Sequence, residues 1–146
     1  MPKDMEVCFP ATMGGLTTAL ATIDQFGAAR NLCADEISRA RIVAEELITN
    51  AIKYGYGDAS ERPIRLRLSA DPVLTLTYDD EAEPFDPTQW RPRKDAATAR
   101  LEHREGRAGI DLVLGLSSTA RYESRPGGNR LVLTFAPRPA SGGKAR

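Results

Sequence analysis

The sequence predicts an α+β domain of two layers: an antiparallel-rich mixed sheet with helices on one of its faces. Two observations favour this class. Some segments repeat apolar residues every three to four positions, the period of a helix with one buried side. Others alternate apolar and polar residues, as strands with one face in water do. Along the chain these segments run helix, helix, hairpin, long loop, helix, hairpin, which fits helices packed against a largely antiparallel sheet.

Length and composition narrow the class of protein further. A chain of 146 residues with 41% hydrophobic residues is one folded domain rather than two domains or a disordered chain. Its 20 basic and 20 acidic residues cancel, which argues against bulk nucleic-acid binding. The sequence has no apolar run of membrane-spanning length and no secretory signal at its start. Cys8 and Cys33 have no metal-binding spacing and are interpreted as buried or incidental thiols of a reducing cytosol, so we expect a cytoplasmic protein.

Two helices are predicted in the first third of the chain. Helical spacing of apolar residues covers residues 13–29, and a broader apolar stripe covers residues 36–54. Asp35 is the expected N-cap of the second helix, because a short polar side chain can accept a hydrogen bond from a free backbone N–H. Gly55 and its neighbours are expected to end that helix.

Two hairpins and a third helix follow. Alternation predicts strands around Ile64–Leu68 and Leu74–Tyr78, joined at Asp71-Pro72, and a second pair around residues 120–124 and 131–135. Helical spacing returns over residues 109–117. The stretch from Trp90 to Arg107 has no clear period, which is typical of a lid, a binding loop or a disordered segment. We therefore expect one domain over residues 1–136, with a disordered tail over 137–146.

The second helix carries a polar pair inside its apolar stripe. Glu46 and Asn50 are four residues apart, so they project from the same face. A carboxylate can accept a proton, and an amide oxygen is a hard ligand suited to Mg²⁺. The alternative is structural: Glu46 faces solvent at the edge of the stripe and Asn50 caps a neighbouring backbone group.

Two further patterns suggest a nucleotide. Asp80 ends a predicted strand, where its carboxylate could accept a hydrogen bond from the exocyclic amine that distinguishes adenine from guanine; the alternative is an acidic turn closed by proline. Gly106 and Gly109 come just before a predicted helix, where backbone N–H groups and the helix dipole can meet an anion. The alternative there is a helix start with no ligand.

The order of these patterns resembles the GHKL superfamily of ATP-binding domains, whose Bergerat fold is shared by gyrase, heat-shock chaperone, histidine-kinase and mismatch-repair ATPases. The chain is most similar to the short anti-sigma-factor serine/threonine kinases of bacteria. The resemblance rests on Glu46-x-x-x-Asn50-Ala51-Ile52-Lys53-Tyr54-Gly55-Tyr56 as the N box, Asp80-x-Ala82-x-Pro84-Phe85-Asp86-Pro87 as the first glycine box, and Gly106-Arg107-Ala108-Gly109-Ile110-Asp111-Leu112-Val113 as the second. It extends from about residue 6 to residue 136.

The resemblance implies a role for each matching residue. Glu46 would be the general base, Asn50 the Mg²⁺ ligand, Lys53 a phosphate-neutralising cation and Asp80 the partner of the adenine amine. Residues 90–107 would form the ATP lid. The residues expected to bind the nucleotide are Asn50, Lys53, Asp80, Ala82, Phe85, Gly106, Arg107, Ala108, Gly109 and Ile110.

The sequence departs from the family pattern at three positions. Ala82 stands where the first glycine box usually has glycine, and its methyl group could crowd the base or disfavour a positive φ. Tyr54 occupies a position that is often histidine, and Asn129 replaces a threonine seen in several relatives. Glu45 lies beside Glu46, but only Glu46 shares the helix face of Asn50.

The function implied by the resemblance is ATP-dependent phosphorylation of a serine or threonine on an anti-sigma-factor antagonist of the STAS type. The same resemblance implies that the chain sequesters a sigma factor, usually as a homodimer, without direct contact to nucleic acid or membrane. The alternative is a regulatory binding module that responds to ATP without transferring a phosphoryl group.

Overall fold

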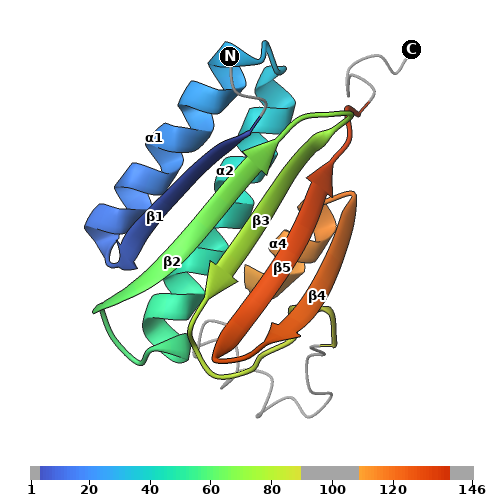
Figure 1. Cartoon of the computed structure of the whole chain (residues 1–146). Helices are drawn as coiled ribbons and strands as arrows, with labels where there is room; N and C mark the ends of the chain where they lie inside the picture. The colour runs from blue at the N-terminus through green and yellow to red at the C-terminus, as the bar shows by residue number, and fades with distance from the viewer. Residues whose placement is uncertain (1–3, 90–108, 139–146) are drawn as a thin grey trace.

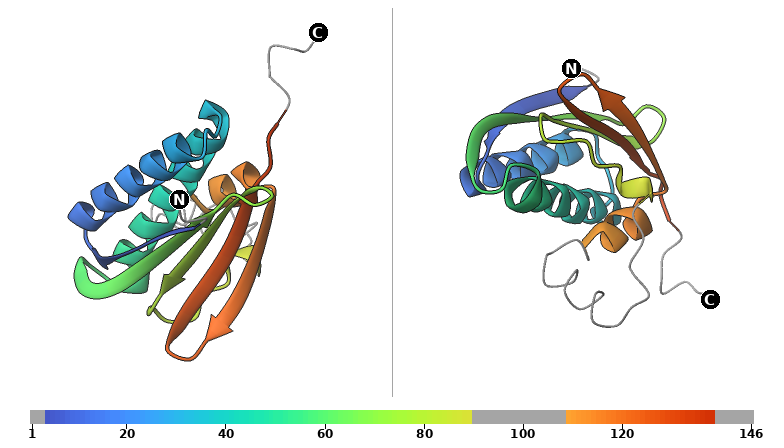
Figure 2. Two further views of the ribbon diagram at one scale, coloured as in Figure 1. Left: turned by 45° about the horizontal axis from the view of Figure 1, so that its top comes forward. Right: turned by 90° about the horizontal axis from the view of Figure 1, so that it is seen from below.

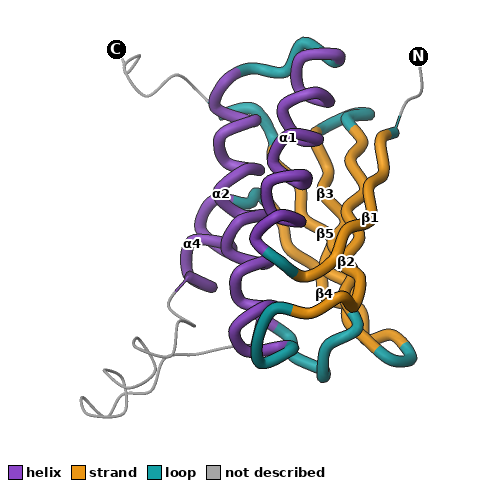
Figure 3. The backbone as a smooth tube through the Cα atoms, turned by 90° about the vertical axis from the view of Figure 1, so that its left-hand side faces the viewer, coloured by secondary structure: helices purple, strands orange, loops and turns teal. Residues whose placement is uncertain are grey.

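The computed structural model describes residues 4–89 and 109–138. Within these residues the strands form one sheet in the order β1-β2-β3-β5-β4 (Figure 1). Helices α1, α2 and α4 lie together on one face of that sheet, and no helix of the described residues covers the other face (Figure 2 and Figure 3). The predicted two-layer α+β fold is confirmed. Every strand pairing in the sheet is antiparallel, so the sheet is not mixed.

The first strand was not predicted. β1 (Met5–Ala11) pairs antiparallel with β2, with Phe9 opposite Ile64. Apolar and polar residues do alternate in β1, and Phe9 is buried. Pro10 interrupts this run, and proline is compatible with a strand only at an edge or a bulge. β1 satisfies both conditions, because it is an edge strand and its register shifts after Pro10.

Helix α1 (Met13–Ala29) has the predicted bounds, and α2 (Ala34–Asn50) begins close to its predicted start. The predicted cap of α2 is wrong. Cys33 occupies the N-cap, and its backbone N–H donates to Oε1 of Glu36 at 3.1 Å. Asp35 is the second residue of α2, and its carboxylate pairs with Arg39 instead of capping the helix.

The second helix also ends earlier than predicted. The α-helical geometry stops at Asn50, and residues Ala51–Gly55 form a single π-helical turn, here called the π turn. Its wider hydrogen bond runs from the Tyr56 N–H to the Ala51 carbonyl at 2.7 Å. Turns of this kind often occur at functional sites, because the extra residue changes the direction of the side chains that follow.

Both predicted hairpins are present. β2 (Ser60–Ser69) pairs with β3 (Leu74–Asp80), and β4 (Thr119–Arg125) pairs with β5 (Gly128–Phe135). The hairpins join through β3 and β5, which places Asp80 at the end of one strand opposite Asn129 at the start of the other. Helix α4 (Gly109–Leu116) precedes β4, and a short 3-10 turn (Pro87–Gln89) follows β3.

The core lies between the two layers. The sheet contributes buried leucines at the centre of its inner face, among them Leu66, Leu76 and Leu133. Val43 and Ile48 of α2 pack against them as members of the same hydrophobic cluster. Burial of this continuous surface is the main favourable term in folding and fixes α2 over the middle of the sheet.

The remaining predictions concern the lid and the tail, the two cysteines, and membrane-spanning helices. The expected lid over 90–107 and most of the expected tail, residues 139–146, lie outside the described residues. The two cysteines, Cys8 and Cys33, are both exposed free thiols, which excludes the first of the two alternatives, buried or incidental. In the described parts of the chain, no helix is both long enough and apolar enough to cross a membrane.

A buried arginine ties three elements together. The side chain of Arg39 on α2 is 3% exposed and pairs with Asp35 at 2.9 Å. It also donates to the carbonyl of Leu116 at the end of α4 at 3.2 Å, and to that of Ala136 after β5 at 2.6 Å. Its guanidinium carbon lies 5.9 Å from the centroid of the Phe135 ring. Arg39 therefore anchors the C-terminal end of α4 to α2 and to the sheet.

Replacing this arginine should destabilise the fold. Arg39→Met keeps the apolar stem but leaves two half-buried carbonyls without the Arg39 donor, which should lower the free energy of unfolding by about 2–4 kcal/mol. The matched control is Arg41→Met, because Arg41 lies on the same helix and forms a more exposed pair with Asp24 at 2.7 Å. Its loss should cost about 1 kcal/mol or less. Urea unfolding measures both, and equal losses in the two variants would contradict the role assigned to Arg39.

Candidate functional site

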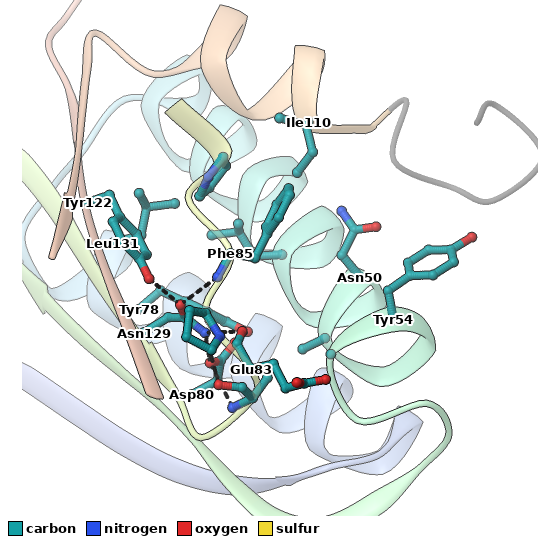
Figure 4. A pocket seen from close by; sticks show the side chains of 16 residues that line it. Asn50, Tyr54, Tyr78, Asp80, Glu83, Phe85, Ile110, Tyr122, Asn129 and Leu131 are labelled. Carbon is teal, nitrogen blue, oxygen red and sulfur yellow. Dashed lines mark hydrogen bonds between the residues drawn. The ribbon is translucent and has the colours of Figure 1, made fainter. Parts of the chain in front are cut away.

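A pocket of about 290 Å³ opens between the end of α2, the end of β3 and the start of α4. Asn50 and Tyr54 line one side of it, and Asp80, Glu83 and Asn129 line the opposite side (Figure 4). The three motif regions identified in the sequence therefore meet in one place. Because Asn50 and Asp80 come from different layers, only the folded chain brings them together.

Asn50 is the last residue of α2 and lines the pocket. Its Nδ2 atom is buried and has no hydrogen-bond partner among the described residues. A buried amide without a partner costs about 1–3 kcal/mol, so a ligand that satisfies it would bind favourably there. The described residues contain no group of three or more His, Cys, Asp or Glu side chains that could hold a metal. A cation bound at Asn50 would therefore take most of its ligands from a bound phosphate and water, as Mg²⁺ commonly does.

Glu46 lies one turn before Asn50 and is half-buried, whereas its neighbour Glu45 is exposed. The Glu46 carboxylate contacts Gly109 at the start of α4: a Cβ atom built on Gly109 would lie 1.8 Å from Glu46 Oε1. Glycine is thus required at position 109 for the carboxylate to stay where it is. This contact gives a structural reason for the glycine of the second box and brings Glu46, rather than Glu45, to the N-terminus of α4.

The lysine and the tyrosine of the N box differ in their position relative to the pocket. Lys53 is exposed and is not among the residues that line the pocket. Tyr54 lines the pocket instead, beside Asn50 (Figure 4). Lys53 and Tyr54 both belong to the π turn. This turn changes how the side chains are rotated around the helix axis, so that Tyr54 and not Lys53 lines the pocket.

Asp80 is held by three hydrogen-bond donors. Its Oδ2 accepts from the Tyr78 hydroxyl at 2.7 Å, and its Oδ1 accepts from the Ala82 N–H at 3.1 Å and from Asn129 Nδ2 at 2.8 Å. Tyr78 is buried, and this burial, together with the nearby charge of Asp80, raises the pKa of the Tyr78 hydroxyl well above its usual range. The hydroxyl therefore keeps its proton and acts as a donor to the carboxylate.

Ala82 lines the pocket and is buried. Its φ is not positive, and its methyl group packs against the π turn, since a Cβ atom built on Gly55 would lie 2.9 Å from Ala82 Cβ. Further along the same loop, the Phe85 side chain lines the pocket near Ile110 of α4 (Figure 4). The pocket therefore combines a polar end at Asp80 with apolar walls suited to a planar ring.

Tyr56 joins the two sides of the pocket. Its hydroxyl donates to the Pro63 carbonyl at 3.1 Å and accepts from the Glu81 N–H at 2.8 Å, and the guanidinium carbon of Arg62 lies 4.9 Å from its ring centroid. Burial raises the pKa of this hydroxyl. Tyr56 thus connects the end of the π turn to the residue after Asp80.

The second glycine box holds five of the residues that were expected to bind the nucleotide. Gly109 and Ile110 lie at the start of α4, and Ile110 lines the pocket. Gly106, Arg107 and Ala108 lie outside the described residues.

Among the pocket residues that were not predicted as site residues, Tyr78, Tyr122 and Asn129 take part in the hydrogen bonds around Asp80. Tyr122 was interpreted as a strand position and Tyr78 as the strand residue that leads into the acidic segment at Asp80. Asn129 was interpreted as part of the turn before the last strand, where several relatives have threonine. A polar residue directly opposite Asp80 would indicate that it belongs to the site. Recognising that Asn129 lies there requires the register between β3 and β5, which is not a local property of the sequence.

The contribution of the Tyr78 hydroxyl to the free energy of unfolding should depend on pH. Below the ordinary tyrosine pKa of about 10, the hydroxyl is protonated in both folded and unfolded chains, and its bond to Asp80 is fully present. Above that pH the unfolded chain loses the proton first, so folding becomes less favourable. Tyr78→Phe should therefore destabilise the protein by about 1 kcal/mol near neutral pH, with the difference from wild type shrinking above about pH 10. Urea unfolding across this range tests it, and a constant difference would contradict it.

Comparisons with known proteins agree with this geometry. The model of the histidine kinase-like ATPase domain matches residues 9–135. A search of curated proteins found no match. Among solved structures, the chain is similar to the crystal structure of the RsbU and RsbW domains of Rv1364c from Mycobacterium tuberculosis, with a TM-score of 0.64 and 20% identity. That match covers 96% of this chain and 34% of the other, so this chain spans about a third of that protein's length and shares its fold. Because the family model covers nearly all of the described fold, the chain belongs to the histidine kinase-like ATPase domain family.

Proposed function

We propose that this chain binds ATP and transfers its γ-phosphoryl group to a serine or threonine of a partner protein. The observation that carries the proposal is the placement of a buried, unpartnered Asn50 amide across one pocket from an Asp80 carboxylate held by donors. An adenine amine fits the second group, and the phosphate end of the same molecule fits the first. The family shown above supports ATP as the ligand.

The proposed binding mode uses the described residues as follows. Asp80 accepts a hydrogen bond from the adenine amine, while Phe85 and Ile110 contact the ring. Asn50 contributes a ligand to Mg²⁺, which when bound neutralises phosphate charge. The N–H groups at the start of α4, from Gly109 onward, face the phosphates. On the basis of their motifs, the remaining proposed phosphate contacts are Gly106, Arg107, Ala108 and Lys53.

Glu46 is the proposed general base. In the transfer step, a serine or threonine oxygen forms a bond to the γ-phosphorus, and the bond from that phosphorus to the bridging oxygen of ADP breaks. The hydroxyl proton passes to a Glu46 carboxylate oxygen. Glu46 is suited to this position because its carboxylate lies against Gly109, one turn from Asn50 and next to the proposed phosphate site.

The proposed partners come from the resemblance of the motifs. We infer a STAS-type anti-sigma-factor antagonist as the phosphorylated protein, a sigma factor as the protein that the chain sequesters, and a homodimer as its assembly. The similarity to a structure that contains an RsbW domain supports this direction. Such a role would place the chain in the cytoplasm, where ATP and the transcription machinery are found.

A pair of adjacent glutamates provides the test. Glu46→Gln should reduce the rate of phosphoryl transfer from radiolabelled Mg-ATP to STAS proteins of the same genome by about a hundredfold or more. It should leave ATP binding intact, because the change removes the proton acceptor and keeps the side-chain shape. The matched control is Glu45→Gln, one residue away and exposed, which should transfer at the wild-type rate.

Two results would contradict the proposed kinase. Normal transfer by the Glu46→Gln variant would remove Glu46 from the mechanism. A wild-type chain that binds ATP but phosphorylates none of these proteins would instead favour a regulatory module that responds to ATP without phosphoryl transfer.

A further inference from the structure

The Asn129 side chain is the most highly connected polar group in the described pocket. Asn129 is 7% exposed and lies at the start of β5, directly opposite Asp80. Its Nδ2 donates to Asp80 Oδ1 at 2.8 Å, to the Glu83 carbonyl at 3.1 Å and to the Ala82 carbonyl at 3.3 Å. One buried amide thus holds both the carboxylate and the loop that follows it.

The orientation of this amide is fixed by its other end. Asn129 Oδ1 accepts from the Phe85 N–H at 3.0 Å and from the Tyr122 hydroxyl. A backbone N–H can only donate, so the oxygen must face Phe85 and the NH₂ group must face Asp80. The reversed amide would point its oxygen at a carboxylate and two carbonyls, all of which are acceptors.

This arrangement limits what Asp80 can still bind. A carboxylate offers about four acceptor positions, two on each oxygen. The Ala82 N–H and Asn129 Nδ2 fill those of Oδ1, and the Tyr78 hydroxyl fills one on Oδ2. The Ala82 N–H and the Asn129 NH₂ group can only donate, so among the described residues Oδ1 has no partner to which it could donate a proton. One acceptor position on Oδ2 remains for a ligand.

We propose that Asn129 is a positioning residue that sets the base specificity of the pocket: it keeps Asp80 an acceptor with one open position, which selects a ring bearing an exocyclic amine. The inference rests on the proposed nucleotide site and extends it to a residue that touches Asp80. A ring with a carbonyl at that place would set one acceptor against another and be rejected.

The test replaces the amide by a group that can donate only when protonated. In Asn129→Asp, the introduced carboxyl is buried beside Asp80, and both burial and the like charge favour its protonated form. Protonated, it donates to Asp80 Oδ1 and accepts from Phe85 as the amide does. Ionised, it faces the acceptors that the amide satisfied and disturbs both Asp80 and the loop.

Other titratable groups lie around position 129, so the affinity of the variant is compared with that of wild type at each pH. Among the described residues, those that line this pocket, line the neighbouring pocket that Asn129 also borders, or lie next to them are Cys8, Tyr54, Tyr56, Arg62, Arg65, Tyr78, Asp79, Asp80, Glu81, Glu83, Tyr122, Arg125 and Arg130. All of them are present in wild type, as is the phosphate ionisation of ADP, so the ratio of variant to wild-type affinity isolates the introduced carboxyl.

Calorimetric titration with Mg-ADP from about pH 5.5 to about pH 8.5 gives that ratio. For Asn129→Asp, we expect affinity within about threefold of wild type at the acid end and at least about tenfold weaker at the alkaline end. The matched control is Ser124→Asp, which adds the same charge at the exposed β4 residue paired with Asn129 and should show a ratio independent of pH. A defect that does not depend on ionisation of the introduced carboxyl would lower the affinity equally at every pH.

A second variant keeps the inference testable if Asn129→Asp does not fold. Tyr122→Phe removes only the hydroxyl that donates to Asn129 Oδ1, and ADP affinity should fall by about threefold. Unchanged ADP affinity in that variant, or a pH-independent ratio in a folded Asn129→Asp, overturns the role of Asn129 alone. A wild-type chain that does not bind ADP overturns the nucleotide site itself.

Discussion

The antiparallel pairing of β3 with β5 is the constraint on which the pocket depends. It places Asp80 opposite Asn129 at the point where β3 ends and β5 begins. The two backbones approach so closely there that a Cβ atom built on Gly128 would lie 1.9 Å from the Asp80 carbonyl oxygen. Only glycine fits at position 128, so the polar end of the pocket requires this residue as well as the two that carry its hydrogen bonds.

The other end of the pocket depends on how α2 stops. If the α-helix continued, the residues after Asn50 would keep the same rotation around its axis. The π turn changes that rotation, lines the pocket with Tyr54 and leaves Lys53 exposed. Tyr56 then fixes the turn to the backbone after Asp80. A single hydroxyl thus couples the part of the pocket proposed for phosphates to the part proposed for the base.

The sequence was sufficient for features that repeat locally. Helix α1 and the two hairpins follow from apolar periods of 3.6 and 2, and Glu46 and Asn50 share a helix face because they are four residues apart. Features that depend on distant contacts were missed. The cap of α2 was assigned to Asp35, whose carboxylate pairs instead with Arg39, a residue buried by bonds to carbonyls 77 and 97 residues away. The π turn and Asn129 depend on contacts across 25 and 49 residues, respectively, which no local pattern contains.

Binding of Mg-ADP to the purified chain, measured by calorimetry for wild type, Asn50→Ala and Thr49→Ala, tests the central claim most directly. Thr49 is the matched control, because it lies next to Asn50 and its hydroxyl bonds to the helix backbone. The account predicts micromolar or tighter binding by wild type and by Thr49→Ala, and a loss of about tenfold or more in Asn50→Ala. Absence of binding by wild type, or equal binding by all three chains, would contradict it.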